Sequence, residues 1–320
     1  MLKFILKVVK ALISSKIFLK IFILIGSILE KIFKKYFEKK YNISDHWSSK
    51  IANLTWAHLK GFQAFKTHNF AKILGSSKKV SLIFPYFKKE KEMLNAIKSL
   101  KEQSFNSNFQ YNDIEIIVIN DGDKDSKIEE KLPEEIIYIY RNKFNYGISR
   151  SRNLGAKVSS GRLLVFVDPD FIFPSDYCET VYNEYLKYGK NNIITGYLED
   201  YFYKNYNSDP REAFGVWENP DRITKRFYHV AGGHMAIDRN IFFESGGFDE
   251  DLIYGGVEDV YYGSKLSENE NLGVVYSTKM RVKHVPHKIS FAHNQVNKSL
   301  TLTALKNPRF YYNFFLNNER

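Results

Sequence analysis

Two aspartates separated by one proline follow an apolar run near the middle of the sequence. The segment reads RLLVFVDPDFIFPSDY over residues 162–177, and the acids are Asp168 and Asp170. Residues i and i+2 of an extended segment point to one side, so both carboxylates can address one site, while Pro169 stiffens the backbone between them. Adjacent carboxylates suit a hard divalent cation that keeps positions open for phosphate oxygens. The spacing predicts a site for a metal ion and a diphosphate. The alternative is that both aspartates serve only as turn and cap residues before the helix expected at 176–189.

The composition fits a large folded protein with an anionic partner. The chain has 320 residues, of which 44% are hydrophobic and 16% aromatic, and a net charge of +11. It can bury a sizeable core, which excludes a disordered protein. The positive charge allows nucleic acid, an acidic membrane face or a phosphorylated small molecule as partner and does not choose among them. The single cysteine, Cys178, excludes an intramolecular disulfide and a cysteine zinc cluster, and it favours a reducing compartment, the cytoplasm.

Residues 1–78 are predicted to form a helical appendage. Lys3, Lys7 and Lys10 fall within about 60° of arc on a helix, and apolar residues fill much of the remainder. This pattern predicts that residues 1–40 are a basic amphipathic anchor, peripheral at the inner face of the cell membrane. A helical hairpin that docks on the core or on a partner subunit would show the same pattern.

From Val80 onward the pattern changes to alternating strands and helices. Apolar runs typical of buried strands lie at 80–87, 113–121, 135–142 and 162–168. Segments with helical spacing lie at 89–103, 149–160 and 176–189. This order predicts an α/β fold with a mixed, mostly parallel sheet flanked by helices. Ligands bind beyond the carboxyl ends of such strands, which is where Asp121, Asp168 and Asp170 are expected.

Several motifs in the right order resemble one known family. VSLIFPYF, EIIVINDGD and NYGISRSRNLGAKVSSGRLLVFVDPD resemble the nucleotide-sugar half of the family 2 glycosyltransferases, which have the Rossmann-like GT-A fold. GGHMAIDRNIFFESGGFDEDLIYGGVEDVYYGSKL and VKHVPH are similar to the acceptor half shared by bacterial chondroitin-type polymerases and galactosyltransferases. The resemblance implies a domain over 79–295, with a nucleotide-sugar half at 79–175 and an acceptor and catalytic half at 176–295. The C-terminal tail, 296–320, has no assigned role.

The resemblance also implies roles for individual residues of this sequence. The nucleotide-sugar-binding residues are Pro85, Tyr86, Asp121, Arg152 and Asp168. The metal ligands, for Mn²⁺ or Mg²⁺, are Asp170 and His284, with Asp168 at the ribose or the metal. The acidic pair that contains the catalytic base is Glu258 and Asp259, and Asp259 is predicted to be that base. One departure is that Asn120, Asp121, Gly122 and Asp123 stand where the family has Asp-Asp-Gly-Ser.

Structural roles remain open for the same residues. Arg152 could cover the sheet or pair with an acid, although a guanidinium suits a diphosphate. His284 shares a strand face with Met280 and Val282, so it could be a packed histidine. Glu258 and its neighbour follow a glycine turn and could cap the next helix.

The predicted function is sugar transfer. We expect an inverting, metal-dependent glycosyltransferase, a hexosyl- or N-acetylhexosaminyltransferase, that moves a sugar from a UDP-sugar to a hydroxyl of a glycan or lipid-linked saccharide. Bacterial surface polysaccharide synthesis is the expected setting. The alternatives are a nucleotidyltransferase with a similar sheet, a non-catalytic basic binding module and an inactive scaffold. No nucleic acid partner is expected, because the lysines concentrate in the N-terminal segment instead of alternating with aromatic residues.

Overall fold

The computed structural model describes residues 78–106, 108–140, 145–199, 220–227, 230–252 and 257–285, together with residues 303 and 307. The predicted anchor, residues 1–40, lies outside the described residues, as does almost all of the predicted appendage and tail. Within the described ranges, no helix has the length and apolar character needed to cross a membrane.

The first half of the domain builds four parallel strands connected by helices. The strands are β1 (Val80–Tyr86), β2 (Ile114–Asn120), β3 (Ile137–Tyr140) and β4 (Leu163–Val167). The connecting helices are α5 (Glu90–Lys101), α6 (Ile128–Lys131) and α7 (Ile148–Val158). The strands lie in the order β3-β2-β1-β4, and every neighbouring pair is parallel. The chain therefore reverses its direction of winding between β1 and β4, which is where ligands bind in open α/β sheets.

The second half extends this sheet beyond β4. Its strands are β5 (Phe171–Ile172), β6 (Asn192–Glu199), β7 (Ile223–Thr224), β8 (His234–Asp238) and β9 (Gly273–His284). From β4 the order continues β8-β6-β9-β5, and β7 pairs with β9. Because β8 is antiparallel to β4 and β6, and β5 and β7 are antiparallel to β9, these three strands oppose the other six. The predicted mixed, mostly parallel α/β sheet is confirmed.

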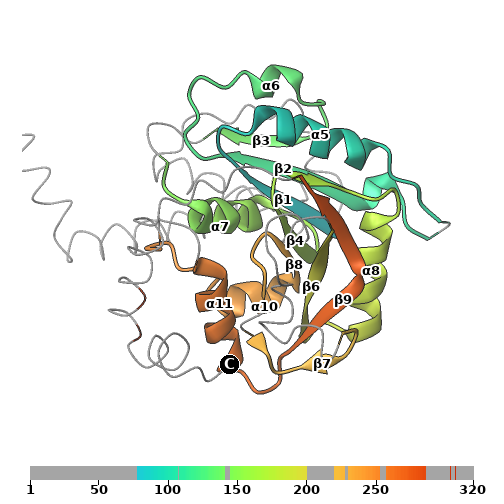
Figure 1. The fold of residues 1–320 in the computed structure, drawn as a ribbon, viewed down its shortest axis with the longest axis vertical. Helices are drawn as coiled ribbons and strands as arrows, with labels where there is room; N and C mark the ends of the chain where they lie inside the picture. The colour runs from blue at the N-terminus through green and yellow to red at the C-terminus, as the bar shows by residue number, and fades with distance from the viewer. Residues whose placement is uncertain are drawn as a thin grey trace, which may run out of the picture. The chain divides into compact units, whose positions relative to one another are not determined.

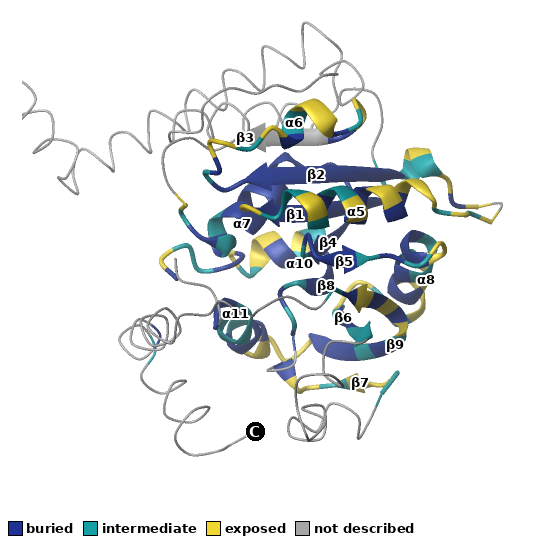
Figure 2. Ribbon diagram, turned by 45° about the horizontal axis from the view of Figure 1, so that its top comes forward, coloured by how far each residue is buried: buried dark blue, intermediate teal, exposed yellow. Residues whose placement is uncertain are grey.

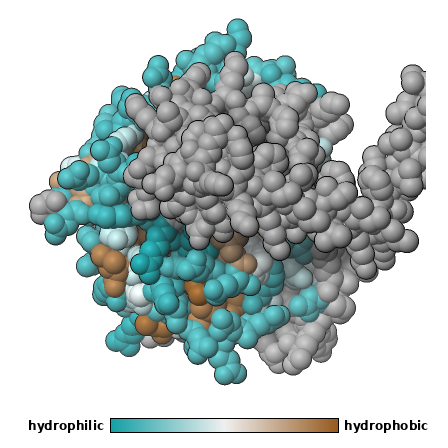
Figure 3. All heavy atoms as spheres, turned by 180° about the vertical axis from the view of Figure 1, so that it is seen from behind, coloured by the Kyte–Doolittle hydropathy of each residue, from teal (hydrophilic) through white to brown (hydrophobic). Residues whose placement is uncertain are grey.

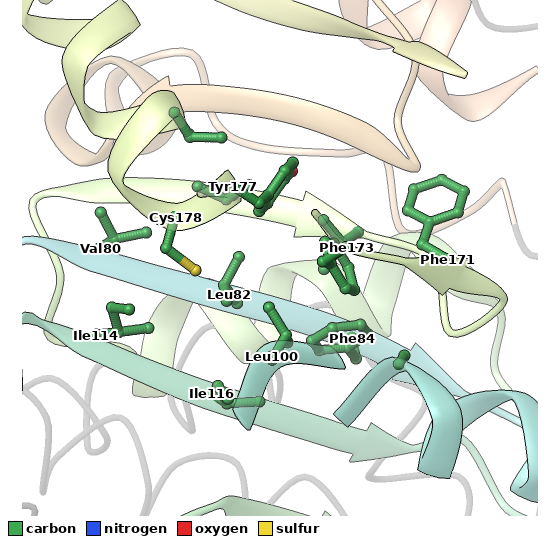
Figure 4. Close-up of a cluster of buried hydrophobic side chains, with 14 of the residues drawn as sticks. Val80, Leu82, Phe84, Leu100, Ile114, Ile116, Phe171, Phe173, Tyr177 and Cys178 are labelled. Carbon is green, nitrogen blue, oxygen red and sulfur yellow. The ribbon is translucent and has the colours of Figure 1, made fainter. Parts of the chain in front are cut away.

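Side chains alternate along β1 and give each face of the sheet its own helices. Val80, Leu82 and Phe84 face one core, shared with α5 and α8 (Tyr177–Tyr188), and Figure 4 shows this cluster around Cys178. Ile83 faces α7, where a Cβ on Gly155 would lie 2.2 Å from Ile83 Cγ2. In Figure 1, α7 lies to the left of the sheet and α8 to its right. Every residue of β1, β2 and β4 is buried, and β2 is accordingly dark blue along its length in Figure 2.

A second core lies under α10 (Arg239–Glu244) and α11 (Glu258–Ser267). Phe166 of β4 packs edge-on against Phe248 at 5.3 Å, and Phe248 lies 4.6 Å from Tyr262 of α11. Removing a buried ring of this kind costs about 3–5 kcal/mol. These aromatic contacts fix the start of α11 next to the end of β4.

The described surface carries few large apolar side chains. Figure 3 shows one face on which hydrophilic residues predominate outside the grey part. The exposed large apolar residues are Phe87, Leu186, Ile223 and Phe243. They come from separate elements, so this surface resembles that of an ordinary folded domain.

Candidate active site

Arg152 lies at the centre of an ion-pair network that joins the two halves of the domain. It comes from α7 and is only 2% exposed. Nη2 donates to Asp168 Oδ1 at 3.3 Å, and Nη1 donates to Glu258 Oε1 at 2.9 Å. Its guanidinium carbon lies 5.3 Å from the ring centre of Phe248. One positive charge thus holds two carboxylates from elements far apart in the sequence.

Two glycines of the loop before β8 lie against this network. The backbone N–H of Asp168 donates to Gly233 O at 3.1 Å. A Cβ on Gly233 would lie 2.2 Å from Asp168 Oδ2, and one on Gly232 would lie 2.6 Å from Arg152 Nη1. Any larger residue would displace charged groups. Burial raises the pKa of Asp168, the nearby Arg152 lowers it, and repulsion from Asp170 raises it further.

Asp170 lies between a lysine and a histidine. Its side chain is 2% exposed, and Lys89 Nζ donates to Oδ2 at 2.5 Å. His284 Nε2 lies 3.8 Å from Oδ1. The pairing of β5 with β9 causes this approach, because Phe171 is opposite His284 in the register. The structure therefore brings together Asp170 and His284, two of the three residues predicted at the metal.

The geometry of Asp170 and His284 fits a divalent cation. Metal–ligand bonds of about 2.0–2.2 Å place two ligand atoms of one ion roughly 3–4 Å apart. The 3.8 Å between Oδ1 and Nε2 lies within that range, and a carboxylate oxygen suits Mg²⁺ and Mn²⁺. Across the described ranges, no group of three His, Cys, Asp or Glu side chains is arranged to hold a metal. The remaining positions around an ion would fall to water and to phosphate oxygens.

The acidic pair at the start of α11 is divided between two environments. Glu258 is 5% exposed and bound to Arg152. Asp259 accepts from Gly232 N–H at 3.2 Å and from Val260 N–H at 2.8 Å. Burial and repulsion from Glu258 raise the pKa of Asp259 to about 6, against the opposing effect of Arg152 and the two backbone N–H groups. A carboxyl with this pKa can accept a proton near neutral pH.

Asp121, predicted at the base or ribose, contacts the start of α7. Oδ1 accepts from Tyr146 N–H at 3.0 Å, and Oδ2 accepts from Gly147 N–H at 2.9 Å. Its own N–H donates to Tyr86 O at 2.8 Å, which keeps the end of β2 beside the end of β1. Asp121 thus lies at the expected edge of the sheet, and its contact with a nucleotide stays a prediction.

Tyr86, the last residue of β1, and Phe87, the residue after it, differ in exposure. Tyr86 is 1% exposed, and its hydroxyl lies 3.2 Å from Asp123 Oδ2 and 2.7 Å from Ser126 Oγ. Pro85 is buried within the strand. Phe87 is 37% exposed, so it presents an aromatic ring at the sheet edge. The nucleotide-sugar-binding role of Pro85 and Tyr86 stays a prediction.

Sequence reasoning missed two residues at this edge, Phe87 and Lys89. Phe87 directly follows the last residue of β1, where the chain leaves the buried sheet, so its position after the strand is the signal that could have found it. The sequence around Lys89 gives a weaker indication of its position. It is one of several lysines that follow β1, and only the fold shows which of them meets Asp170.

Residues 81–248 match the family model described as Glycosyl transferase family 2. These residues make up more than half of the chain. The match contains Arg152, Asp168 and Asp170. Glu258, Asp259 and His284 lie beyond it, because the match ends within the predicted acceptor half, 176–295.

Two curated relatives match parts of the chain. Glycosyltransferase GlyA of Streptococcus pneumoniae is 31% identical over 124 residues, which are 37% of this chain and 17% of GlyA. Chondroitin synthase of Escherichia coli is 25% identical over 243 residues, which are 62% of this chain and 35% of the synthase. The chain spans well under half the length of these relatives.

Solved structures show the same fold at low identity. Residues 1–349 of S. aureus TarS in complex with UDP give a TM-score of 0.54 at 17% identity, over 72% of this chain and 66% of that fragment. Mannosyltransferase PcManGT from Pyrobaculum calidifontis, in complex with GDP-Man and Mn²⁺, gives 0.53 at 14% identity, over 82% of this chain and 73% of that one. The sheet has the arrangement of these GT-A glycosyltransferases.

Proposed function

The chain belongs to glycosyl transferase family 2, and from this premise we propose that it moves a sugar from a UDP-sugar to a hydroxyl of a glycan or lipid-linked saccharide. One observation carries the proposal. Arg152 binds both Asp168, at the carboxyl ends of the parallel strands, and Glu258, beside the candidate base. The sheet edge at which the donor diphosphate would bind is thus held next to the candidate proton acceptor. Transfer of a sugar to a hydroxyl requires both groups at one site.

The donor is proposed to lie along the ends of β1, β2 and β4. The UDP bound to TarS and the GDP-Man bound to PcManGT support a nucleotide-sugar donor. The exposed ring of Phe87 offers a stacking surface for the base. Asp170 and His284 would hold Mn²⁺ or Mg²⁺, which as a Lewis acid neutralises the charge that develops on the leaving diphosphate.

Asp259 is proposed as the general base. It accepts the proton of the acceptor hydroxyl while that oxygen attacks the anomeric carbon and the bond to the diphosphate oxygen breaks on the opposite face. A single displacement of this kind inverts the anomeric configuration. The raised pKa of Asp259 supports this role, since a hydroxyl loses its proton more readily to a carboxylate of higher pKa. Glu258 is committed to Arg152 and keeps the guanidinium in place.

The acceptor is proposed to be a bacterial surface polysaccharide or its lipid-linked precursor. The similarity to chondroitin synthase supports a glycan acceptor. The galactosyltransferase-like character of the acceptor half and the choice between hexosyl and N-acetylhexosaminyl transfer belong to this proposal as well.

The setting is proposed to be the inner face of the cell membrane, through residues 1–40, which lie outside the described residues. Deleting them should release the protein from anionic vesicles and leave UDP binding intact, because each basic residue near such a surface contributes about 1 kcal/mol. Co-sedimentation with phosphatidylserine vesicles measures this. Unchanged co-sedimentation after the deletion would refute the anchor.

A thermal-shift panel tests the proposed function without knowledge of the acceptor. Ligands that bind the native state raise the melting temperature by mass action. UDP with Mn²⁺ should raise it more than UDP or Mn²⁺ alone and more than GDP with Mn²⁺, and Asp170→Ala should lose the Mn²⁺ dependence. Stabilisation by nucleoside triphosphates alone would favour the nucleotidyltransferase, and no stabilisation by any nucleotide would refute both enzymes.

A further inference from the structure

Lys89 reaches the candidate metal ligand from the turn between β1 and α5. Its Nζ donates to Asp170 Oδ2 at 2.5 Å, and its side chain is 34% exposed whereas that of Asp170 is 2% exposed. The preceding residue, Lys88, has φ 54°, a left-handed conformation that is uncommon outside glycine. The turn therefore holds a strained backbone next to the residue that meets Asp170, and such strain is concentrated at functional sites.

The two oxygens of Asp170 have different neighbours. Oδ2 accepts from Lys89, and Oδ1 faces His284 Nε2 at 3.8 Å. An ion held between Oδ1 and Nε2 leaves the lysine on Oδ2, so both cations can adjoin one carboxylate. The pairing is therefore compatible with a bound metal.

The two cations that hold this acidic cluster differ in what they can still bind. Arg152 is 2% exposed and its Nη atoms bind Asp168 and Glu258. Lys89 is one-third exposed, and an ammonium group has three N–H donors, of which Asp170 takes one. Of these two, Lys89 is the cation with exposed surface at the end of β1. A compact ammonium is also a common partner of phosphate oxygens.

We propose that Lys89 is a built-in cation of the diphosphate site, which pairs with Asp170 and also contacts the donor diphosphate. This rests on the proposed function and deepens it. Lys89 holds part of the donor before any metal binds, and its positive charge opposes the entry of the metal. The residue therefore has opposite effects on the two ligands.

Loss of Lys89 should change UDP affinity and Mn²⁺ affinity in opposite directions, and this distinguishes the proposed role from a structural one. Without Lys89, a diphosphate loses a partner and UDP binds more weakly in the absence of divalent ions. Mn²⁺ alone binds more tightly, since Asp170 is no longer paired with another cation and the repulsion is gone. If Lys89 only held Asp170 in position, its loss would weaken both ligands.

The test compares Lys89→Met with Lys91→Met in the full-length chain. Lys91 is exposed in the first turn of α5, so the control makes the same charge change without touching Asp170. UDP binding is measured by calorimetry in EDTA, and Mn²⁺ binding by the electron paramagnetic resonance signal of free Mn²⁺. Lys89→Met should weaken UDP about tenfold and tighten Mn²⁺ about threefold or more, whereas Lys91→Met should change each by less than about twofold. Lys89→Arg should retain UDP binding because it keeps the charge.

Two results would overturn the assignment. They are UDP binding by Lys89→Met that equals that of Lys91→Met, and Mn²⁺ binding that weakens in Lys89→Met. The wild-type protein separates this failure from that of the proposed function. If it bound no nucleotide even with Mn²⁺, sugar transfer from a nucleotide donor would be refuted, and with it the diphosphate contact of Lys89.

Discussion

The site contains two pairs of acids, one at the end of β4 and one at the start of α11. Asp168 and Asp170 form the strand pair, and Glu258 and Asp259 form the helix pair. Arg152 takes one acid from each, at 3.3 Å and 2.9 Å. The remaining acid of each pair has a different environment. The comparison of these two acids, Asp170 and Asp259, indicates how one fold can give two carboxylates two roles.

Asp170 pairs directly with a cation, whereas Asp259 accepts from backbone N–H groups and lies beside another carboxylate. Asp170 lies against the ammonium of Lys89 and near His284, so its surroundings suit a carboxylate that holds positive charge. Asp259 has two backbone N–H donors and a neighbouring carboxylate, and its pKa rises to about 6 against the opposing charge of Arg152. We infer that charge environment, rather than residue type, assigns metal binding to one acid and proton transfer to the other.

The largest effect is expected from a substitution in the helix pair. Asp259→Asn keeps the shape and much of the hydrogen bonding but cannot accept a proton, so transfer should fall by roughly 10²–10⁴ while UDP affinity with Mn²⁺ stays near that of the wild type. Calorimetry and a transfer assay on the same preparations measure this. Asp170→Ala is the matched change in the strand pair, and it should instead lose Mn²⁺-dependent UDP binding. Full transfer by Asp259→Asn would refute the assignment of the base.

The next largest effect is expected from removing Arg152, which links the two pairs. Arg152→Met leaves two partly buried carboxylates without their shared cation, which should destabilise the fold by about 3–5 kcal/mol. Arg150→Met is the control in the same helix, because Arg150 makes a half-exposed ion pair with Glu250 at 3.2 Å and should cost less than about 1 kcal/mol. Urea denaturation of both variants measures the difference. Equal losses would show that the buried network does not hold the halves together.

The sequence predicted the strand pair better than the helix pair. Apolar runs that end in acids are a local pattern, and the carboxyl ends of parallel strands must share an edge, so the positions of Asp121, Asp168 and Asp170 followed from β2 and β4. The motif order also gave the family. Tyr86 was predicted from the family resemblance, whereas the exposure of Phe87, the residue after β1, depends on the fold.

The partners of the acids could not be predicted, because they depend on contacts between distant segments. Nothing near Glu258 in the sequence indicates that Arg152 will bind it, and no local pattern selects Lys89 among its neighbouring lysines. His284 reaches Asp170 only because β5 pairs antiparallel with β9. These choices are made by tertiary packing.

A smaller effect tests the glycine loop that lies against both pairs. Gly233→Ala would place a Cβ 2.2 Å from Asp168 Oδ2 and push the carboxylate away from Arg152. Crowding of this kind costs about 1–3 kcal/mol. Urea denaturation should show that most of this loss disappears in the Asp168→Ala background, because the clash needs the carboxylate. Additive losses would place the cause in the backbone instead.

The smallest effect is the pH dependence that follows from the raised pKa of Asp259. A general base acts only when ionised, so kcat/KM should fall about tenfold per pH unit below the Asp259 pKa of about 6. An ordinary aspartate, with a pKa of about 4, would place this limb two units lower. The folded protein binds the Asp259 proton more tightly than the unfolded chain does, so this group adds stability as the pH falls from about 6 to about 4. In Asp259→Asn, the fall of kcat/KM below about pH 6 should disappear from the residual activity. The gain in stability between about pH 6 and about pH 4 should disappear as well. A limb that persists in the variant would belong to another group, and the two acids would then no longer differ in the way that the charge environments require.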